Sequence, residues 1–276
     1  MWGFTPVLGK LISLKALDLV WWRLVISSLS LFLYIRYKGI SLKCSLKDVF
    51  YLLGWGAIVG LHWFFFYHAI KVANVSIALA GFSTITLFAS IMQPIMLKKN
   101  FFWGDVLYGV IIAAGILVIL QFEKFYAMGI LFGVLAALTG AMFGIYNGKL
   151  IKKHDAGKIT FYEFSGALLT ISIIQIYQGN FFKIPFPGSN DLIYLIILGL
   201  FCTTLAFTLS VQILRRIDPL TVIITNNLEP IYGVVFSLLI FGESEMMSGG
   251  FYAGASLLLM AVFTYPFFKR KFNPEL

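Results

Sequence analysis

Ten apolar runs, each separated from the next by a short polar joint, make up most of the sequence and limit what it can fold into. We place them at residues 1–14, 17–36, 49–70, 75–97, 104–121, 127–148, 160–179, 191–213, 219–241 and 248–268. Most have about 20 residues, the length of a helix that crosses a hydrocarbon core of roughly 30 Å. Because a segment in lipid must satisfy its own backbone hydrogen bonds, the runs predict an all-α integral membrane protein with about ten transmembrane helices.

The composition supports lipid as the main solvent of this chain. Apolar residues make up 60% of it and charged residues only 12%, whereas a soluble domain has roughly a quarter charged residues. The first run is short, since 14 helical residues reach only ~21 Å, so we expect the start of this helix to be missing from the sequence. It has neither the basic segment nor the cleavage site of a signal peptide.

Lysine and arginine in the joints predict the orientation. With the N-terminus inside, the even-numbered joints and the C-terminal tail carry 15 of the 21 basic residues, and the odd-numbered joints carry four. Short basic loops stay in the cytoplasm, so both termini are predicted to be cytoplasmic in a multi-pass protein of the cell (inner) membrane. The same distribution explains the net charge of +9 without a nucleic-acid partner, because the basic residues do not follow one polar face.

The two halves of the chain are weakly similar. Gly-Lys-Leu-Ile occurs at Gly9–Ile12 and again at Gly148–Ile151, each near the end of the first run of its half. Further on, a gapless overlay pairs Lys71 with Arg216, Ser76 with Thr221, Gly104 with Gly249, and Gly109 with Gly254. Five runs per half is an odd number, so the second half must cross the membrane upside down. We therefore predict two inverted five-helix repeats, at residues 1–122 and 123–276.

Several short motifs occur in a characteristic order along the chain. They are Trp2-Gly3, Gly9-Lys10, Arg23, Leu228-Glu229-Pro230, Gly242-Glu243 and Gly254. In this order and at this spacing the chain resembles the EamA-type family of the drug/metabolite transporter superfamily. The resemblance implies ten helices in inverted repeats, alternating access, and a central cavity shared by both halves. It does not imply one substrate, because relatives move amino acids, purines, drugs and sugar-linked metabolites.

The ninth run contains a predicted interruption at membrane depth. Pro230 has no N–H, and its ring collides with the carbonyl of Asn226, so a helix should bend there. Asn226, Glu229 and Gly233 follow at helical spacing and share one face beside the bend. The overlaid residues of the fourth run include Ser83 and Thr84, again polar in an apolar run. Inverted-repeat carriers bind their substrates at such paired interruptions.

Glu229 is the most informative of these residues. A carboxyl group deep in a bilayer costs several kcal/mol unless it is protonated, paired or hydrated. It could couple transport to protons or bind a cation, or it could be a neutral acid that caps the carbonyl freed by Pro230. The sequence leaves both interpretations open, and Glu229 is the predicted proton-coupling candidate.

Other polar and aromatic residues complete the candidate site. Arg23 either snorkels to the outer interface above Trp21 and Trp22 or contacts an anionic group of the substrate. His62 and His68 lie about 240° apart on a helix and have no partner ligands, so they predict no metal site and are read as hydrogen-bonded core residues. The predicted substrate-binding residues are Arg23, Trp63, Tyr67, Ser83, Thr84, Asn147, Asn226, Asn227, Glu229 and Tyr232.

The favoured function is a secondary transporter of small organic metabolites, such as amino acids or drug-like solutes, expected to act as an exporter. No GxxxxGK[ST] loop is present, so no ATP-driven step is expected, and no cofactor is predicted. The predicted partners are a small-molecule substrate and membrane lipids, and the sequence leaves homo-oligomerisation open. The alternatives are an intramembrane enzyme that uses Glu229 with a histidine, and a non-transporting membrane scaffold.

Overall fold

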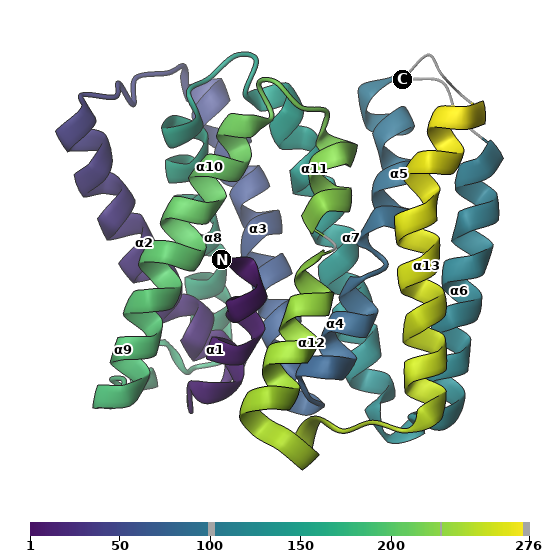
Figure 1. Cartoon of the computed structure of the whole chain (residues 1–276). Helices are drawn as coiled ribbons and strands as arrows, with labels where there is room; N and C mark the ends of the chain where they lie inside the picture. Colours follow the sequence, from purple (N-terminus) through teal and green to yellow (C-terminus); the bar gives the residue numbers. More distant parts are fainter. Residues whose placement is uncertain (99–102, 227, 273–276) are drawn as a thin grey trace.

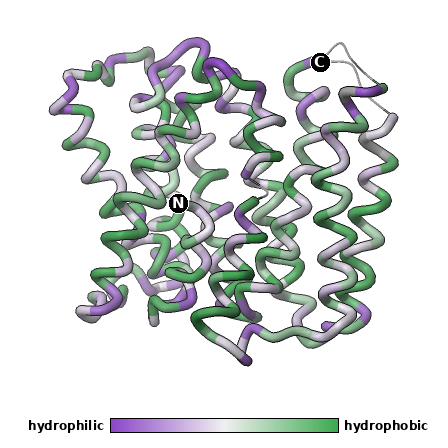
Figure 2. The backbone as a smooth tube through the Cα atoms, in the orientation of Figure 1, coloured by the Kyte–Doolittle hydropathy of each residue, from purple (hydrophilic) through white to green (hydrophobic). Residues whose placement is uncertain are grey.

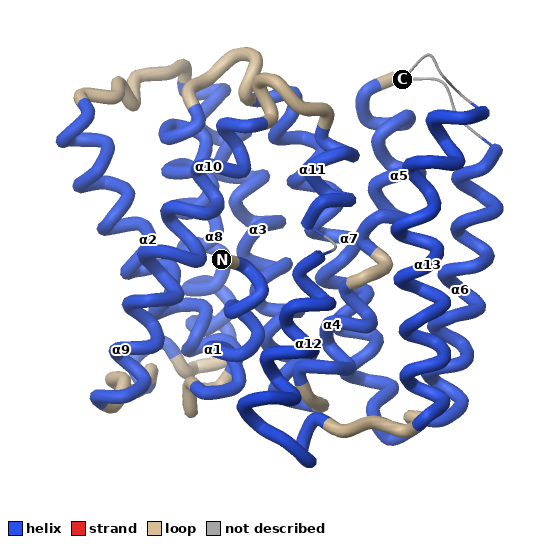
Figure 3. The backbone as a smooth tube through the Cα atoms, viewed as in Figure 1, coloured by secondary structure: helices blue, strands red, loops and turns tan. Residues whose placement is uncertain are grey.

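The computed structural model describes residues 1–98, 103–226 and 228–272, and within them every regular element is a helix (Figures 1 and 3). Eight segments are long and apolar enough to cross a membrane. They are α2 (Ala16–Lys38), α3 (Leu46–Val72), α4 with α5 (Val75–Phe82 and Ile85–Leu97), η2 with α7 (Lys124–Tyr126 and Ala127–Leu150), α8 (Ala156–Tyr177), α9 with η4 and α10 (Ser189–Ile197, Leu198–Leu205 and Ala206–Ile213), α11 with α12 and η5 (Pro219–Asn226, Leu228–Phe241 and Gly242–Glu245), and α13 (Gly249–Phe272).

Two shorter segments complete the set. The apolar helix α6 covers Trp103–Phe122, and η1 (Trp2–Phe4) leads into α1 (Thr5–Leu11). A further single turn, η3 (Phe181–Lys183), lies in the joint before α9. The ten segments therefore follow the ten predicted spans in order, and this confirms the predicted all-α membrane fold. The N-terminus lies about halfway along the length of the neighbouring helices, where α1 begins (Figure 1).

The polar joints gather at the two ends of the bundle (Figure 2). The end at the top of the view carries the joints after α2, α7 and α10, which hold Lys43, Lys152, Lys153, Arg215 and Arg216. We call this the basic end and the opposite one the acidic end, after Asp18, Asp191, Glu243 and Glu245. The orientation of these ends across a membrane stays a prediction from the basic bias.

Matched spans of the two halves run in opposite directions, and the fourth packs on the ninth as the fifth packs on the tenth. The last helix of each half, α6 and α13, form an antiparallel pair at one edge of the molecule (Figure 1). A Cβ atom on Gly254 would lie 2.8 Å from the carbonyl oxygen of Gly115, so glycine is needed for this close approach. In the middle, α4 packs on α12 and α5 packs on α11. The fourth and ninth spans therefore face each other across the centre of the protein.

Small residues also bring α3 against α8 in the other part of the bundle. A Cβ atom on Gly56 would lie 2.3 Å from the backbone oxygen of Glu163, and one on Gly166 would lie 2.1 Å from that of Leu53. In lipid there is no hydrophobic drive between helices, so such close packing contributes much of their association. The contact fixes Glu163 firmly beside α3.

Candidate functional site

A cavity lies between the two halves, at the level of the break between α4 and α5. Its empty space measures about 850 Å³, a volume that includes the part open to solvent. Its wall comes from α2, α3, α7, α10, α11 and α12 and from the break between α4 and α5. Both repeats therefore contribute to one site.

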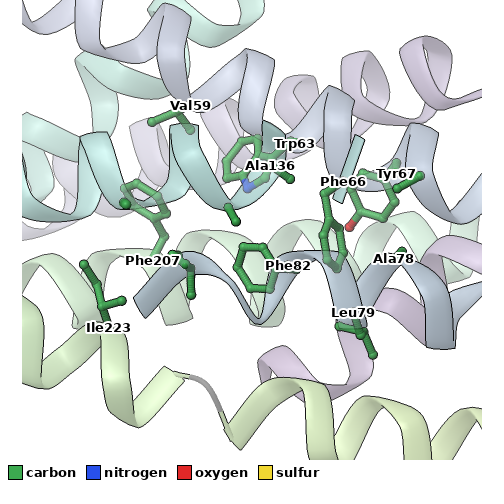
Figure 4. Close-up of a cluster of buried hydrophobic side chains, with 14 of the residues drawn as sticks. Val59, Trp63, Phe66, Tyr67, Ala78, Leu79, Phe82, Ala136, Phe207 and Ile223 are labelled. Carbon is green, nitrogen blue, oxygen red and sulfur yellow. The ribbon is translucent and has the colours of Figure 1, made fainter. Parts of the chain in front are cut away.

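Aromatic rings form most of this wall. Trp63 and Phe66 come from α3, Phe82 from the end of α4, Phe143 from α7, and Phe207 from α10. Figure 4 shows four of these rings, Trp63, Phe66, Phe82 and Phe207, together with Ile223 of α11. Phe143 stacks on Phe207 with 5.7 Å between ring centroids. Such a wall suits a flat or apolar body better than a hydrated ion.

The candidate interruption of the fourth span is present. α4 ends at Phe82 and α5 begins at Ile85, with Ser83 and Thr84 between them. In the ninth span, α11 covers Pro219–Asn226, and α12, which contains Pro230, covers Leu228–Phe241. Asn227 lies outside the described residues. The interruption of the ninth span therefore stays a prediction.

Arg23 is held inside the cavity wall by a π-helical turn of the eighth span. The guanidinium is 2% exposed, and its Nε donates a 2.7 Å hydrogen bond to Oγ1 of Thr203. Thr203 lies in η4, and its own hydroxyl donates to the carbonyl oxygen of Leu198, five residues earlier. Single π turns inside helices often occur at functional sites. Here the turn gives Arg23 a polar partner inside an apolar span.

The same guanidinium has two further partners on α3. Its NH1 donates to the hydroxyl of Tyr67 at 2.9 Å, and its central carbon lies 4.0 Å from the ring centroid of Trp63. Arg23 therefore does not snorkel to an interface, because the side chain is enclosed by these groups. The site holds a fixed positive charge that faces the aromatic cavity.

Glu229 supplies a carboxyl group from the second repeat. It lines the cavity one turn along from Asn226, which lines it too. The Glu229 carboxyl forms no hydrogen bond or ion pair with any residue that the structure describes, Arg23 included. An acid and a base share the cavity without neutralising each other directly.

Asn147 lines the cavity from α7 and is backed by a buried acid. Its Nδ2 donates to Oε2 of Glu163 on α8 at 3.2 Å, and the two residues are 2% and 0% exposed. The remaining oxygens of the pair, Oδ1 of Asn147 and Oε1 of Glu163, have no hydrogen-bond partner among the described residues. Buried polar atoms without partners are unusual and often mark a functional group.

The predicted site residues fall into two groups. Arg23, Trp63, Asn147, Asn226 and Glu229 line the cavity together. Tyr67, Ser83, Thr84 and Tyr232 do not. Tyr67 stands behind the wall as a partner of Arg23, and Ser83 and Thr84 are buried with their hydroxyls bonded to carbonyl oxygens of their own helix. Tyr232 is 54% exposed and packs beside Gly3 instead.

Sequence reasoning missed several lining residues that a helical stripe could have indicated. Phe207, Ser210, Val211 and Leu214 follow one face of α10 at spacings of three and four, and Gly140, Phe143, Gly144 and Asn147 do the same on α7. Small, aromatic and polar residues at this period in an apolar span are typical of a helix face that meets a cavity. His62, also in the wall, behaves as predicted: its Nδ1 lies 2.8 Å from the carbonyl oxygen of Ala136.

The cavity continues toward the basic end. A second hollow there shares Leu214 and Pro219 with the cavity and is also lined by Lys98, Lys149, Lys152, Arg215 and Arg216. A solute could reach the aromatic chamber through this basic mouth.

Polar contacts tie the helices together at the acidic end. Glu245, which is fully buried, accepts from Nζ of Lys10 at 2.8 Å and from the backbone N–H groups of Val75 and Ser76 at 3.0 and 2.9 Å. These last two groups open α4, so a carboxylate of the second half caps a helix of the first. Ser13 donates twice to Asp191, and Lys71 donates to the backbone oxygen of Ile12. These contacts therefore hold the helices together at the acidic end.

No group of three or more His, Cys, Asp or Glu that could hold a metal ion occurs among the described residues.

Comparisons with known proteins bear on both the fold and the activity. A model of the EamA-like transporter family matches residues 1–121 and again residues 127–267. A curated protein, the S-adenosylmethionine uptake transporter of Rickettsia conorii (strain ATCC VR-613 / Malish 7), is 26% identical over 233 residues, which are 83% of this chain and 76% of that protein. A solved crystal structure superposes with a TM-score of 0.69 at 15% identity, over 98% of this chain and 94% of the other, and this likeness shows the fold alone.

Proposed function

Because the chain belongs to the EamA-like transporter family, we propose that it is a secondary transporter whose solutes carry both a positive and a negative group on an apolar or aromatic body. The observation that carries this proposal is the cavity itself, in which Arg23 and Glu229 face one aromatic chamber without pairing with each other. Arg23 would bind an anionic group of the solute, and Glu229 would bind its cationic group.

The aromatic wall would bind the rest of the solute. Trp63, Phe66, Phe82, Phe143 and Phe207 offer ring faces to a flat base or to an alkylated cation. S-adenosylmethionine has a carboxylate, an ammonium group, a sulfonium and an adenine ring, so its chemistry fits all three parts of the site. The uptake transporter from Rickettsia makes it the first solute to test.

Transport would follow from the asymmetry between the two ends. The basic mouth admits solute to the cavity, while the contacts of Glu245 and Asp191 hold the acidic end closed. An outward-open state requires these contacts to break and the basic end to close, and inverted repeats allow this exchange by rocking one half against the other. Export and uptake are then the two directions of one cycle, and the basic end is the proposed cytoplasmic end in the cell membrane.

The test is solute uptake by the purified full chain in liposomes. The panel contains labelled S-adenosylmethionine, methionine, which lacks the aromatic base, and adenosine, which lacks the charged groups. We expect S-adenosylmethionine to be taken up faster than either part, with protein-free liposomes as the blank. Folded protein that moves none of the three, or moves adenosine best, would contradict the proposed solute class.

A transmembrane pH gradient tests the role of Glu229. If this carboxyl couples protons to the solute, an imposed gradient drives accumulation in wild type, and Glu229→Gln abolishes the effect of the gradient. Accumulation that follows the gradient equally well in Glu229→Gln would remove Glu229 from the coupling step.

A further inference from the structure

The buried pair of Asn147 and Glu163 contains more hydrogen-bond acceptors than donors. Nδ2 of Asn147 meets Oε2 of Glu163 at 3.2 Å, and this contact leaves Oδ1 of Asn147 and Oε1 of Glu163 without partners in the described part of the chain. An ionised carboxylate with one donor, fully removed from water, is unfavourable by several kcal/mol. One proton on Glu163 would supply the missing donor.

A proton would also change what Asn147 presents to the cavity. The amide nitrogen and oxygen are nearly isosteric, so half a turn of the amide exchanges them without moving other atoms. When Glu163 is ionised, the Asn147 NH₂ donates to it and the carbonyl oxygen is the free acceptor, as in the structure. When Glu163 is protonated, its O–H donates to the Asn147 carbonyl, and the NH₂ becomes the free donor.

We propose that Glu163 is a proton-binding residue that sets, through Asn147, whether the cavity offers the solute an acceptor or a donor. This inference rests on the proposed transport function. With Glu163 ionised, the Asn147 carbonyl accepts from an N–H or ammonium group of the solute. A proton on Glu163 turns the amide and replaces that acceptor with a donor. The proton and the donor group of the solute then exclude each other, which is the linkage that proton–solute exchange requires.

Neighbouring helices carry ionisable residues that could contact Glu163. α8 packs on α2, α3, α10 and the turn η3, whose one ionisable residue is Lys183, and Asn147 belongs to α7. α10 has no ionisable residue. The ionisable residues that the other three helices carry are Asp18, Arg23, Tyr34, Arg36, Tyr37 and Lys38 on α2, Lys47, Asp48, Tyr51, His62, Tyr67, His68 and Lys71 on α3, and Tyr146 and Lys149 on α7.

None of these groups forms a hydrogen bond or ion pair with Glu163 in the described part of the chain. The ones deepest in the bundle have partners of their own. Arg23 is bound by Thr203 and Tyr67, and His62 by the carbonyl of Ala136. Asn147 is therefore the residue through which a change at Glu163 reaches the cavity.

The inference can be tested on the full chain in lipid nanodiscs without any solute. Infrared difference spectra between acidic and alkaline pH report both the carbonyl band of a protonated carboxyl and the side-chain amide band of an asparagine. We expect wild type to lose a carboxyl band and shift an amide band at one common pH midpoint. Glu163→Gln should remove both changes, and Asn147→Leu should remove the amide change alone. Glu229→Gln is the matched control, because it removes a different carboxyl and leaves the pair intact.

Three results would overturn the inference. They are a wild-type spectrum in which Glu163→Gln removes no carboxyl band, an amide change that survives Asn147→Leu, and carboxyl and amide changes with separate midpoints. If Glu163→Gln does not fold, Asn147→Leu alone carries the test. A carboxyl band with a midpoint different from that of wild type then supports Glu163 as the titrating acid, and an unchanged midpoint contradicts it. Because no solute is added, failure of transport and failure of this inference are separate results.

Discussion

The fourth and ninth spans occupy matched positions in the two halves, but their polar side chains form different contacts. In the first half, the hydroxyls of Ser83 and Thr84 each donate at 2.7 Å to a carbonyl oxygen three residues earlier, and both residues are buried. In the second half, the position that overlays Thr84 is Glu229, whose carboxyl lines the cavity without a partner among the described residues. The polar groups of the fourth span are satisfied by their own backbone, whereas the carboxyl of the ninth span faces the cavity.

The difference shows that two inverted repeats can share a backbone arrangement while their polar side chains have different roles. A hydroxyl that bonds its own helix can remain in a packed interior at little cost. A carboxyl at that depth requires a proton, water or a ligand, so it is retained where a ligand enters. The first half contributes its charge elsewhere, through Arg23 on α2. The two charges of the proposed site thus come from different halves.

Removing the charge of the first half is expected to have a large effect on solute affinity. Arg23→Gln loses the guanidinium and its bonds to Thr203 and Tyr67, and hydrogen bonds to charged groups contribute about 1.5–3 kcal/mol each. We expect solute affinity, measured from the concentration dependence of uptake, to fall about 100-fold. Arg23→Lys keeps the positive charge but loses the forked geometry of the guanidinium. Its solute affinity should therefore lie between those of wild type and Arg23→Gln. Near-normal affinity in Arg23→Gln would mean that the second half alone carries recognition.

The carboxylates that cap α4 and α11 should contribute differently to the free energy of unfolding. Glu245 caps α4 from the other half of the protein while fully buried, whereas Asp218 caps α11 through the N–H of Leu220 and also accepts from Nε2 of Gln93 on α5. We expect Glu245→Gln to lower the free energy of unfolding by about 3 kcal/mol, because Lys10 and two helix N–H groups lose their anion. Asp218→Asn should lower it by about 1 kcal/mol. Denaturant unfolding in detergent measures both, and equal losses would contradict the difference between the caps.

Smaller effects are expected at Gly81 and at the overlaid Asn226, which lie three positions before Thr84 and Glu229. Substitution should affect stability at Gly81 and solute affinity at Asn226. A Cβ atom on Gly81 would lie 2.8 Å from the carbonyl oxygen of Ile130 and 3.0 Å from Cα of Gly133. Gly81→Ala should therefore reduce stability by about 2 kcal/mol, because the α4 and α7 backbones must separate. Its overlaid partner is Asn226, which lines the cavity. Asn226→Ala should leave stability within about 0.5 kcal/mol and lower solute affinity about 5-fold; denaturant unfolding and uptake measure the two effects.

Most of the fold could be predicted from the sequence because lipid imposes simple local rules. The length of each apolar run gives a span, and the basic joints mark one end of the bundle. The predicted interruption at Pro230 is also a local property, since it follows from a missing N–H. For the same reason the spacing of Asn226 and Glu229 is enough to place them on one helical face.

The remaining features depend on how helices rotate and pack, which no single run of sequence determines. Arg23 is ambiguous in the sequence because its partner Thr203 lies 180 residues away in a π turn. Tyr232 is predicted to line the cavity but faces outward, since the rotation of α12 is fixed by its packing on α4. The Asn147–Glu163 contact escapes sequence reasoning because it depends on the approach of α7 to α8, although glycines at Gly56 and Gly166 hint at close packing around α8.

Uptake of one solute by two matched variants tests most directly whether Glu229 of the ninth span, and not the overlaid Thr84 of the fourth span, binds the solute. Glu229→Gln and Thr84→Val change overlaid positions by near-isosteric replacements, and both are reconstituted in equal folded amounts beside wild type. We predict that Glu229→Gln falls to the level of protein-free liposomes, and that Thr84→Val keeps uptake within about twofold of wild type, because its hydroxyl bonds only Gly81 among the described residues. Equal losses in the two variants, or a larger loss in Thr84→Val, would contradict this division between the halves.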